Sequence, residues 1–200
     1  MSEPRPAVLL LDVMDTLVYE PFYVEIPAFF GMSFEELLEA KHPTAWAEFE
    51  SGTIDEETLL AKFFRDGRDF DHQGLKDCMR DAFRWVEGME ELVAELAGAG
   101  HELHALSNYA PWYAMIEERL RLSRFLSWSF VSCDMGVRKP HPEAFRGPVR
   151  ALGVAPERCL FVDDREGNCR AARREGLEAI HFQGAGALRS ELEGRALLPG

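Results

Sequence analysis

AVLLLDVMDTL, residues 7–17, joins five consecutive apolar residues directly to Asp12. A short apolar run of this kind is typical of a strand buried on both faces, as in a parallel sheet. Open α/β sheets bind ligands in the crevice beyond the carboxyl ends of their strands. Asp12 is therefore a candidate nucleophile or metal ligand, and Asp15 and Thr16 follow it in the same loop.

Composition narrows the class of protein. The chain has 200 residues, of which 46% are hydrophobic, enough for one core domain with a modest insertion. A net charge of -13 argues against nucleic acid or an anionic membrane as the main partner. The four cysteines show no CxxC spacing, so we expect reduced thiols and no zinc site. We also find no signal-like or membrane-spanning apolar stretch, and expect a cytoplasmic protein.

The chain divides into two regions with different sequence patterns. Residues 19–85 are predicted to be all-helical, and the pair Ser33 and Glu36 forms a capping-box pattern at the start of one helix. The aromatic residues of this block, among them Trp46, Phe49, Phe63 and Phe64, are expected to form its core. From Gly88 onward strands and helices alternate, which predicts parallel strands with right-handed crossovers. The predicted elements are helices at 34–41, 44–50, 56–64, 71–85, 89–99, 111–122, 143–152 and 165–175, strands at 102–106, 128–133, 159–162 and 179–182, and a loop at 134–142.

Polar groups stand at the end of each of the first four predicted strands. They are Asp12, Asp15 and Thr16 after the first, Ser107 and Asn108 after the second, Lys139 in the loop after the third, and Asp163 and Asp164 after the fourth. In a parallel sheet these ends open on one edge, so the groups can converge. Carboxylates from two strands can hold Mg²⁺, which prefers hard oxygen ligands. A hydroxyl and an ammonium suit the oxygens of a phosphoryl group.

Four motifs in this order resemble the haloacid dehalogenase (HAD) superfamily of hydrolases over nearly the whole chain. They are Asp12 with Thr16, Ser107 in HALSN, Lys139 in GVRKPHPEAF, and Asp163-Asp164 in FVDDREGNCRAARREG. The resemblance implies an α/β fold with a Rossmann-like parallel sheet core and helices on both faces. The core would comprise residues 1–18 and 86–200, and residues 19–85 would be an inserted helical cap over the site.

The resemblance also implies a role for most of the strand-end groups. Asp12 would be the nucleophile and would form an aspartyl-phosphate. Thr16 and Ser107 would bind the transferred phosphoryl group, and Asn108 would add a hydrogen bond near it. Lys139 would stabilise the negative charge of Asp12 and of the phosphate.

Mg²⁺ is the cofactor that the resemblance implies. Asp164 would bind it directly, and Asp163 would orient the groups around it. Asp12 would supply a second ligand, and the backbone carbonyl of Met14 a third.

Met14 is the departure from the family pattern. HAD phosphatases usually carry an aspartate two residues after the nucleophile, which protonates the leaving group and then deprotonates the attacking water. A thioether can do neither, and loss of a general acid–base typically costs roughly 10²–10⁴-fold in rate. Asp15 is adjacent, but we expect it to be a turn carboxylate that bonds its own backbone, because alternate residues point different ways.

The leading interpretation is a Mg²⁺-dependent phosphatase of a small phosphorylated molecule, slowed by Met14. Two alternatives stay open: a metal-independent dehalogenase, which needs no such acid, and a non-catalytic relative that binds phosphate or a protein. The sequence does not indicate the substrate or the oligomeric state.

Overall fold

The computed structural model describes residues 8–199, so the predicted first strand residue, Ala7, lies outside the described residues. Five strands form one sheet in the order β3-β2-β1-β4-β5, and every neighbouring pair is parallel. The strands are β1 (Val8–Leu11), β2 (Glu102–Ser107), β3 (Ser127–Val131), β4 (Cys159–Asp163) and β5 (Glu178–His181). The predicted α/β fold with a Rossmann-like parallel sheet is confirmed.

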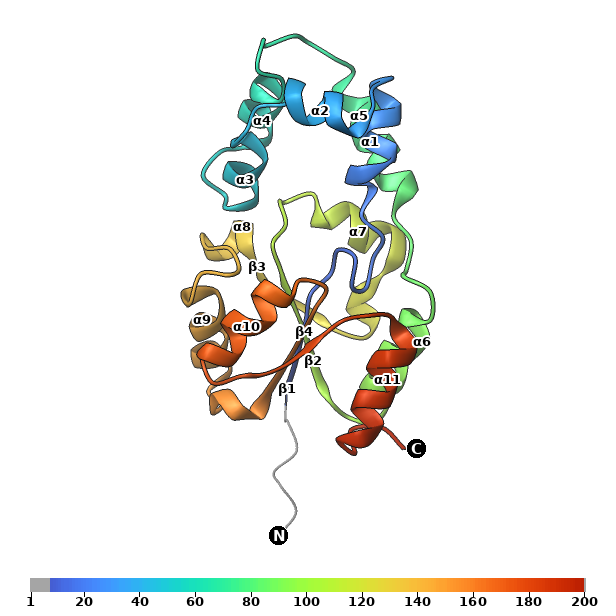
Figure 1. The fold of residues 1–200 in the computed structure, drawn as a ribbon, viewed down its shortest axis with the longest axis vertical. Helices are drawn as coiled ribbons and strands as arrows, with labels where there is room; N and C mark the ends of the chain where they lie inside the picture. The colour runs from blue at the N-terminus through green and yellow to red at the C-terminus, as the bar shows by residue number, and fades with distance from the viewer. Residues whose placement is uncertain (1–7, 200) are drawn as a thin grey trace.

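Helices cover both faces of this sheet (Figure 1). Those on one face are α6 (Met89–Gly98), α7 (Tyr113–Leu120) and α11 (Ala185–Gly194), and those on the other are α9 (Glu143–Leu152) and α10 (Glu166–Arg174). The packing of the central strand, β1, explains why all of its residues are apolar. Leu9 and Leu11 pack in the core that includes α6 and α11, whereas Val8 and Leu10 pack in the core that includes α9 and α10. Alternate side chains of one strand thus enter opposite cores.

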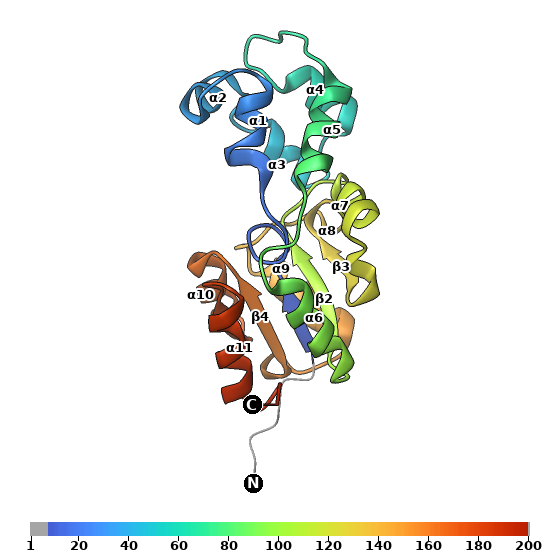
Figure 2. The ribbon, with the colours of Figure 1, turned by 90° about the vertical axis from the view of Figure 1, so that its right-hand side faces the viewer.

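A helical segment, residues 21–82, lies beyond the carboxyl ends of the strands (Figures 1 and 2). Its helices are α1 (Glu25–Phe29), α2 (Phe34–Ala40), α3 (Ala45–Glu50), α4 (Glu56–Lys62) and α5 (His72–Ala82). The predicted capping box opens α2, because Ser33 Oγ accepts from Glu36 N at 3.2 Å and the Glu36 carboxylate accepts from Ser33 N at 2.7 Å. Its predicted aromatic core is also present, since Phe49, Phe63 and Phe64 are buried.

The two connections between this segment and the sheet run side by side. Tyr19 N donates to Arg84 O at 2.9 Å, and Val86 N donates to Leu17 O at 2.8 Å. This pairing explains why α5 ends at Ala82 although helical spacing predicted a helix to Trp85. The residues after Ala82 are extended and hydrogen-bond to the first connection instead of continuing the helix.

A second difference from the sequence prediction lies in the loop expected at 134–142. Its first residues belong to a short helix, α8 (Ser132–Met135). The helical segment rests against this helix at Gly52, where a Cβ would lie 2.4 Å from Cys133 O. Gly52 also has φ +68°, so both its backbone conformation and this close approach require glycine. Between residues 8 and 199, no helix is long and apolar enough to cross a membrane.

Candidate active site

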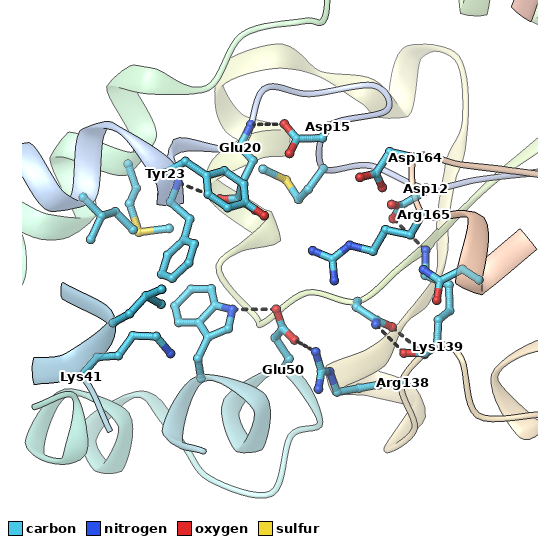
Figure 3. Close-up of a pocket in the computed structure, with 18 residues that line it drawn as sticks. Asp12, Asp15, Glu20, Tyr23, Lys41, Glu50, Arg138, Lys139, Asp164 and Arg165 are labelled. Carbon is cyan, nitrogen blue, oxygen red and sulfur yellow. Dashed lines mark hydrogen bonds and ion pairs between the residues drawn. The ribbon is translucent and has the colours of Figure 1, made fainter. Parts of the chain in front are cut away.

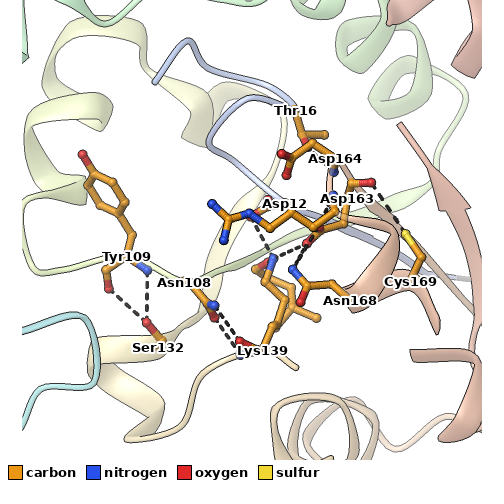
Figure 4. Close-up of polar contacts among 12 residues, drawn as sticks. Asp12, Thr16, Asn108, Tyr109, Ser132, Lys139, Asp163, Asp164, Asn168 and Cys169 are labelled. Carbon is orange, nitrogen blue, oxygen red and sulfur yellow. Dashed lines mark hydrogen bonds and ion pairs between the residues drawn. The ribbon is translucent and has the colours of Figure 1, made fainter. Parts of the chain in front are cut away.

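Charged groups from three separate strand ends meet at the edge of the sheet between β1 and β4. Asp12 N donates to Val162 O at 2.9 Å, which places Asp12 beside Asp163. Lys139 Nζ lies 2.8 Å from Asp12 Oδ1 and 2.7 Å from Asp163 Oδ2 (Figure 4). All three side chains are buried. The strand order reverses between β1 and β4, and open α/β sheets bind ligands at such a switch point. The predicted convergence of these groups is present.

Lys139 is held from its backbone as well as its ammonium. The side-chain amide of Asn108 donates to Lys139 O at 2.8 Å and accepts from Lys139 N at 2.7 Å. Lys139 Nζ donates further to Leu106 O at 2.7 Å. Asn108 therefore fixes the loop that carries the lysine, a contact that the sequence did not reveal. Its predicted hydrogen bond to phosphate stays a prediction.

The two neighbouring aspartates have different surroundings. Both oxygens of Asp163 accept hydrogen bonds. Lys139 Nζ and Asn168 Nδ2 donate to Oδ2. Asn168 Nδ2 also donates to Oδ1 at 3.0 Å, and Arg165 N donates to Oδ1 at 2.8 Å. Asp164 is partly exposed and lines a pocket next to Asp12 (Figure 3). One oxygen from each of Asp12, Asp163 and Asp164 lies within 4.8 Å of the others. Asp164 and Asp12 can therefore face a metal ion, while Asp163 orients its neighbours.

This cluster carries more negative than positive charge. Burial raises the pKa of the Asp12 carboxyl, Lys139 opposes part of that rise, and Asp163 adds to it. Burial and repulsion from Asp163 likewise raise the pKa of Asp164. Burial alone would lower the pKa of Lys139, but Asp12 and Asp163 raise it above its usual value. Three carboxylates face two cations, the Lys139 ammonium and the Arg165 guanidinium, so one negative charge remains and the site favours an added cation over a bare anion.

The two predicted hydroxyl groups lie at neighbouring strand ends. Thr16 is buried, and its Oγ1 accepts a hydrogen bond from Asp164 N at 3.1 Å. Ser107 is the last residue of β2, and its buried Oγ has no hydrogen-bond partner among the residues that the structure describes. An unpaired buried hydroxyl is uncommon in proteins, and a ligand oxygen would satisfy it.

Met14 and Asp15 occupy the turn after Asp12. The Met14 side chain is 9% exposed and lines the pocket. Asp15 has φ +54°, a conformation that aspartate tolerates, and its Oδ1 accepts from Glu20 N at 3.2 Å. Asp15 therefore holds a turn, as expected, but through the backbone of Glu20, five residues on, instead of its own backbone.

A pocket of about 230 Å³ opens between the sheet edge and the helical segment (Figure 3). The sheet side is polar, and the helical side adds aromatic and apolar groups. The helical segment and the connection leading into it contribute Glu20, Phe22, Tyr23, Ile26, Leu38, Lys41, Trp46, Glu50 and Met79. Trp46, which was expected in the core of the helical block, thus also forms part of the pocket wall.

Sequence reasoning missed several charged residues of this pocket. Arg138 forms an ion pair with Glu50 at 2.6 Å and so joins the sheet side to the helical side. Arg165 extends its guanidinium toward the pocket (Figure 3). Glu20 and Lys41 also line it. The only available signal was the position of Arg138 and Arg165 beside motif residues, because the others lie outside every motif.

A sequence model for haloacid dehalogenase-like hydrolases matches residues 8–176. The chain belongs to this family. It is 51% identical over 185 residues to flavin mononucleotide hydrolase 1 of Arabidopsis thaliana, a protein named as chloroplastic; the match covers 92% of this chain and 76% of that protein. It is 31% identical over 93 residues to phosphoglycolate phosphatase of Salmonella paratyphi A, covering 44% of this chain and 37% of the relative.

Solved HAD structures share the fold. A HAD family enzyme of Bacteroides thetaiotaomicron, solved with magnesium and inorganic phosphate, has a TM-score of 0.72 and 19% identity, covering 88% of this chain and 93% of that one. L-2-haloacid dehalogenase of Xanthobacter autotrophicus has a TM-score of 0.64 and 19% identity, covering 96% and 84%.

These comparisons confirm that the HAD-like protein is a hydrolase. The cytoplasmic location stays a prediction, as do the division into core and cap and the roles of individual site residues.

Proposed function

We propose that this HAD-like hydrolase is a Mg²⁺-dependent phosphatase of a small phosphorylated molecule and that Asp12 is its nucleophile. The observation that carries the proposal is the cluster of Asp12, Lys139, Asp163 and Asp164 at the edge of a pocket. The names of two relatives, a flavin mononucleotide hydrolase and a phosphoglycolate phosphatase, support the reaction class.

Each residue of the cluster has a separate role in phosphoryl transfer. A carboxylate oxygen of Asp12 attacks phosphorus and forms an aspartyl-phosphate, which water then hydrolyses. Lys139 neutralises negative charge on Asp12 and on the phosphoryl oxygens. The hydroxyls of Thr16 and Ser107 donate hydrogen bonds to those oxygens. The helical segment, as a cap, limits the access of water.

The donor set fits Mg²⁺. The carboxylates of Asp12 and Asp164 are hard oxygen ligands, and among the described residues the Met14 backbone carbonyl accepts no other hydrogen bond. Mg²⁺ held by these groups supplies positive charge that offsets the repulsion between Asp12 and an anionic substrate.

Flavin mononucleotide is the first substrate to test. The relative that shares half of the aligned residues is named for its hydrolysis. The helical side of the pocket supports a flat aromatic leaving group, because Phe22, Tyr23 and Trp46 line it. Small polar phosphates would leave these aromatic surfaces uncovered.

A substrate panel tests the proposed function. Wild type and Asp12→Asn are assayed with flavin mononucleotide, phosphoglycolate, p-nitrophenyl phosphate and L-2-haloacids, with and without Mg²⁺. We expect Asp12- and Mg²⁺-dependent release of phosphate. Halide release without Mg²⁺ would favour the dehalogenase alternative. Binding of Mg²⁺ and phosphate without turnover of any substrate would favour the non-catalytic alternative.

Asp164→Asn is expected to abolish the rise in melting temperature that Mg²⁺ produces, with little effect on the metal-free protein. Asp164 is partly exposed, so losing its charge removes a ligand without disturbing a buried pair. Asp163→Asn is the matched variant. It is expected to lower the metal-free melting temperature, because Asp163 is fully buried against Lys139 and Asn168. Thermal unfolding with and without Mg²⁺ checks both, and equal responses of the two variants would contradict the assignment.

Tyr23→Ala is expected to raise KM for flavin mononucleotide about tenfold while changing KM for phosphoglycolate little. Tyr23 is 45% exposed and lines the pocket, so its ring can stack on a flat ligand without being needed for folding. Tyr23→Phe, which keeps the ring, serves as the control and should behave as wild type. A parallel rise in KM for both substrates would show that the ring does not select the leaving group.

A further inference from the structure

The phosphatase reaction needs a proton at the leaving oxygen, and Met14 cannot supply one. A group that replaces the missing acid must line the same pocket and keep an oxygen free. In phosphoryl transfer the attacking and leaving oxygens are roughly in line, so the donor must reach the side of phosphorus that faces away from the attacking Asp12 oxygen. The acidic residues that line the pocket, other than Asp12 and Asp164, are Asp15, Glu20 and Glu50.

Glu50 and Asp15 are occupied by other contacts. Glu50 accepts from Trp46 Nε1 at 2.6 Å with one oxygen and pairs with Arg138 at 2.6 Å with the other. Asp15 accepts from the backbone N–H of Glu20 and is fixed in the turn. Glu50 therefore has no oxygen free for a proton. The carboxylate of Asp15 lies at the edge of the pocket, directed at the Glu20 backbone (Figure 3).

Glu20 meets the requirement. It lies in the connection that leads from the sheet into the helical segment, on the opposite side of the pocket from Asp12 and Asp164 (Figure 3). Its Oε1 accepts from Phe22 N at 3.0 Å. Because that contact needs an acceptor, a proton on the carboxyl group belongs on Oε2, which remains available to a ligand.

We propose that Glu20 is the general acid and base of this hydrolase in place of the aspartate that Met14 replaces. The inference rests on the phosphatase function proposed above. As Asp12 bonds to phosphorus, the bond from phosphorus to the leaving oxygen breaks, and that oxygen takes the proton of Glu20. In the second step the Glu20 carboxylate takes a proton from water. The water oxygen bonds to phosphorus, and the electron pair of the broken acyl-phosphate bond returns to Asp12.

The surroundings of Glu20 suit this exchange near neutral pH. Burial raises the pKa of Glu20 to about 7, and the nearby carboxylates of Asp15 and Glu50 add to that effect. The backbone N–H of Phe22 and the Arg165 guanidinium act in the opposite direction. Burial, with smaller contributions from Glu20 and Glu50, raises the pKa of the Tyr109 hydroxyl well above its usual value, so this hydroxyl stays neutral. A general acid is most effective when its pKa lies near the working pH.

The test compares two leaving groups in one enzyme. An alkyl phosphate such as flavin mononucleotide needs a proton at its leaving oxygen, whereas p-nitrophenyl phosphate releases a stable anion. Glu20→Gln keeps an acceptor for Phe22 N but cannot give up a proton. In the first turnover it is expected to slow release of riboflavin from flavin mononucleotide by about 10²–10⁴-fold and the burst of nitrophenolate from p-nitrophenyl phosphate only a few-fold. Steady-state turnover of both substrates should fall, because the second step loses its base. Glu39→Gln is the matched variant, because Glu39 is an exposed carboxyl of α2 that does not line this pocket, and it should change neither first-turnover rate.

The pH profile of wild type gives a second readout that needs no variant. Because the proton donor is the protonated form, kcat for flavin mononucleotide should fall as the pH rises through about 7, and kcat for p-nitrophenyl phosphate should not. Equal slowing of the first turnover with both substrates in Glu20→Gln, slowing with neither, or a leaving-group effect of the same size in Glu39→Gln would overturn the assignment. If wild type shows no Asp12-dependent phosphate release, the phosphatase function itself fails, which is a separate result.

Discussion

Asp12→Asn is expected to lower phosphate release by a factor on the order of 10⁴ or more. Asparagine has nearly the same shape but no ionised oxygen, so it cannot form an aspartyl-phosphate. Hydrolysis of both flavin mononucleotide and p-nitrophenyl phosphate should stop, because neither leaving group departs without nucleophilic attack by Asp12. The measurement is initial-rate phosphate release at saturating Mg²⁺.

Asp15→Asn supplies the control for this result. It changes the next carboxylate of the same loop and keeps an acceptor for Glu20 N, so hydrolysis of p-nitrophenyl phosphate should stay within a few-fold of wild type. Circular dichroism must show that both variants are folded. Phosphate release by Asp12→Asn at a rate similar to wild type would contradict nucleophilic catalysis by Asp12.

Lys139→Met is expected to give the second large effect, on stability as well as activity. The ammonium is 1% exposed and lies between two carboxylates, Asp12 and Asp163. Removing one partner of a buried ion pair typically costs about 3–5 kcal/mol, because the remaining charges are left without compensation. Urea unfolding should show this loss, and hydrolysis should become undetectable.

The loss in Lys139→Met should depend on pH in a defined direction. Without the ammonium, which lowers the pKa of the buried Asp12 carboxyl, that pKa rises further, so the folded state holds a proton that the unfolded state releases. Such a group stabilises the fold below its unfolded pKa and loses that contribution as the pH rises through its folded value. The variant should therefore be more destabilised at pH 8 than at pH 5.

Lys62→Met is the matched control for that experiment. Lys62 pairs with Glu48, but both side chains are about one-third exposed, and exposed pairs contribute at most about 1 kcal/mol. If the two lysine variants lost similar stability, the buried position of Lys139 would not be the reason for its effect.

Much of this site could be predicted from the sequence because its parts are local. Asp12, Ser107 and Asp163 each end or follow a strand that a short apolar run identifies. The parallel arrangement then brings these strand ends to one edge. The helical character predicted for residues 19–85 followed from spacing and from the Ser33 cap, and the structure has helices between residues 21 and 82.

Other parts could not be predicted because they depend on how distant segments pack. The pair of Arg138 and Glu50, the aromatic wall containing Tyr23, and the position of Glu20 arise only where the helical segment meets the sheet edge. No spacing within either segment encodes those contacts. The extended residues after Ala82 are similar, since their partner lies near Val18, more than 60 residues earlier in the chain.

The sequence alone determined the α/β fold and the location of the site, since both follow from short-range patterns of apolar and charged residues. Only the tertiary structure decided how neighbouring acidic residues differ. It engages both oxygens of Asp163 but leaves Asp164 open to the pocket, and it brings Glu20 to the cavity wall while Asp15 holds a turn. The physical reason is that partners and burial set the charge state and freedom of a carboxyl group, and packing supplies both.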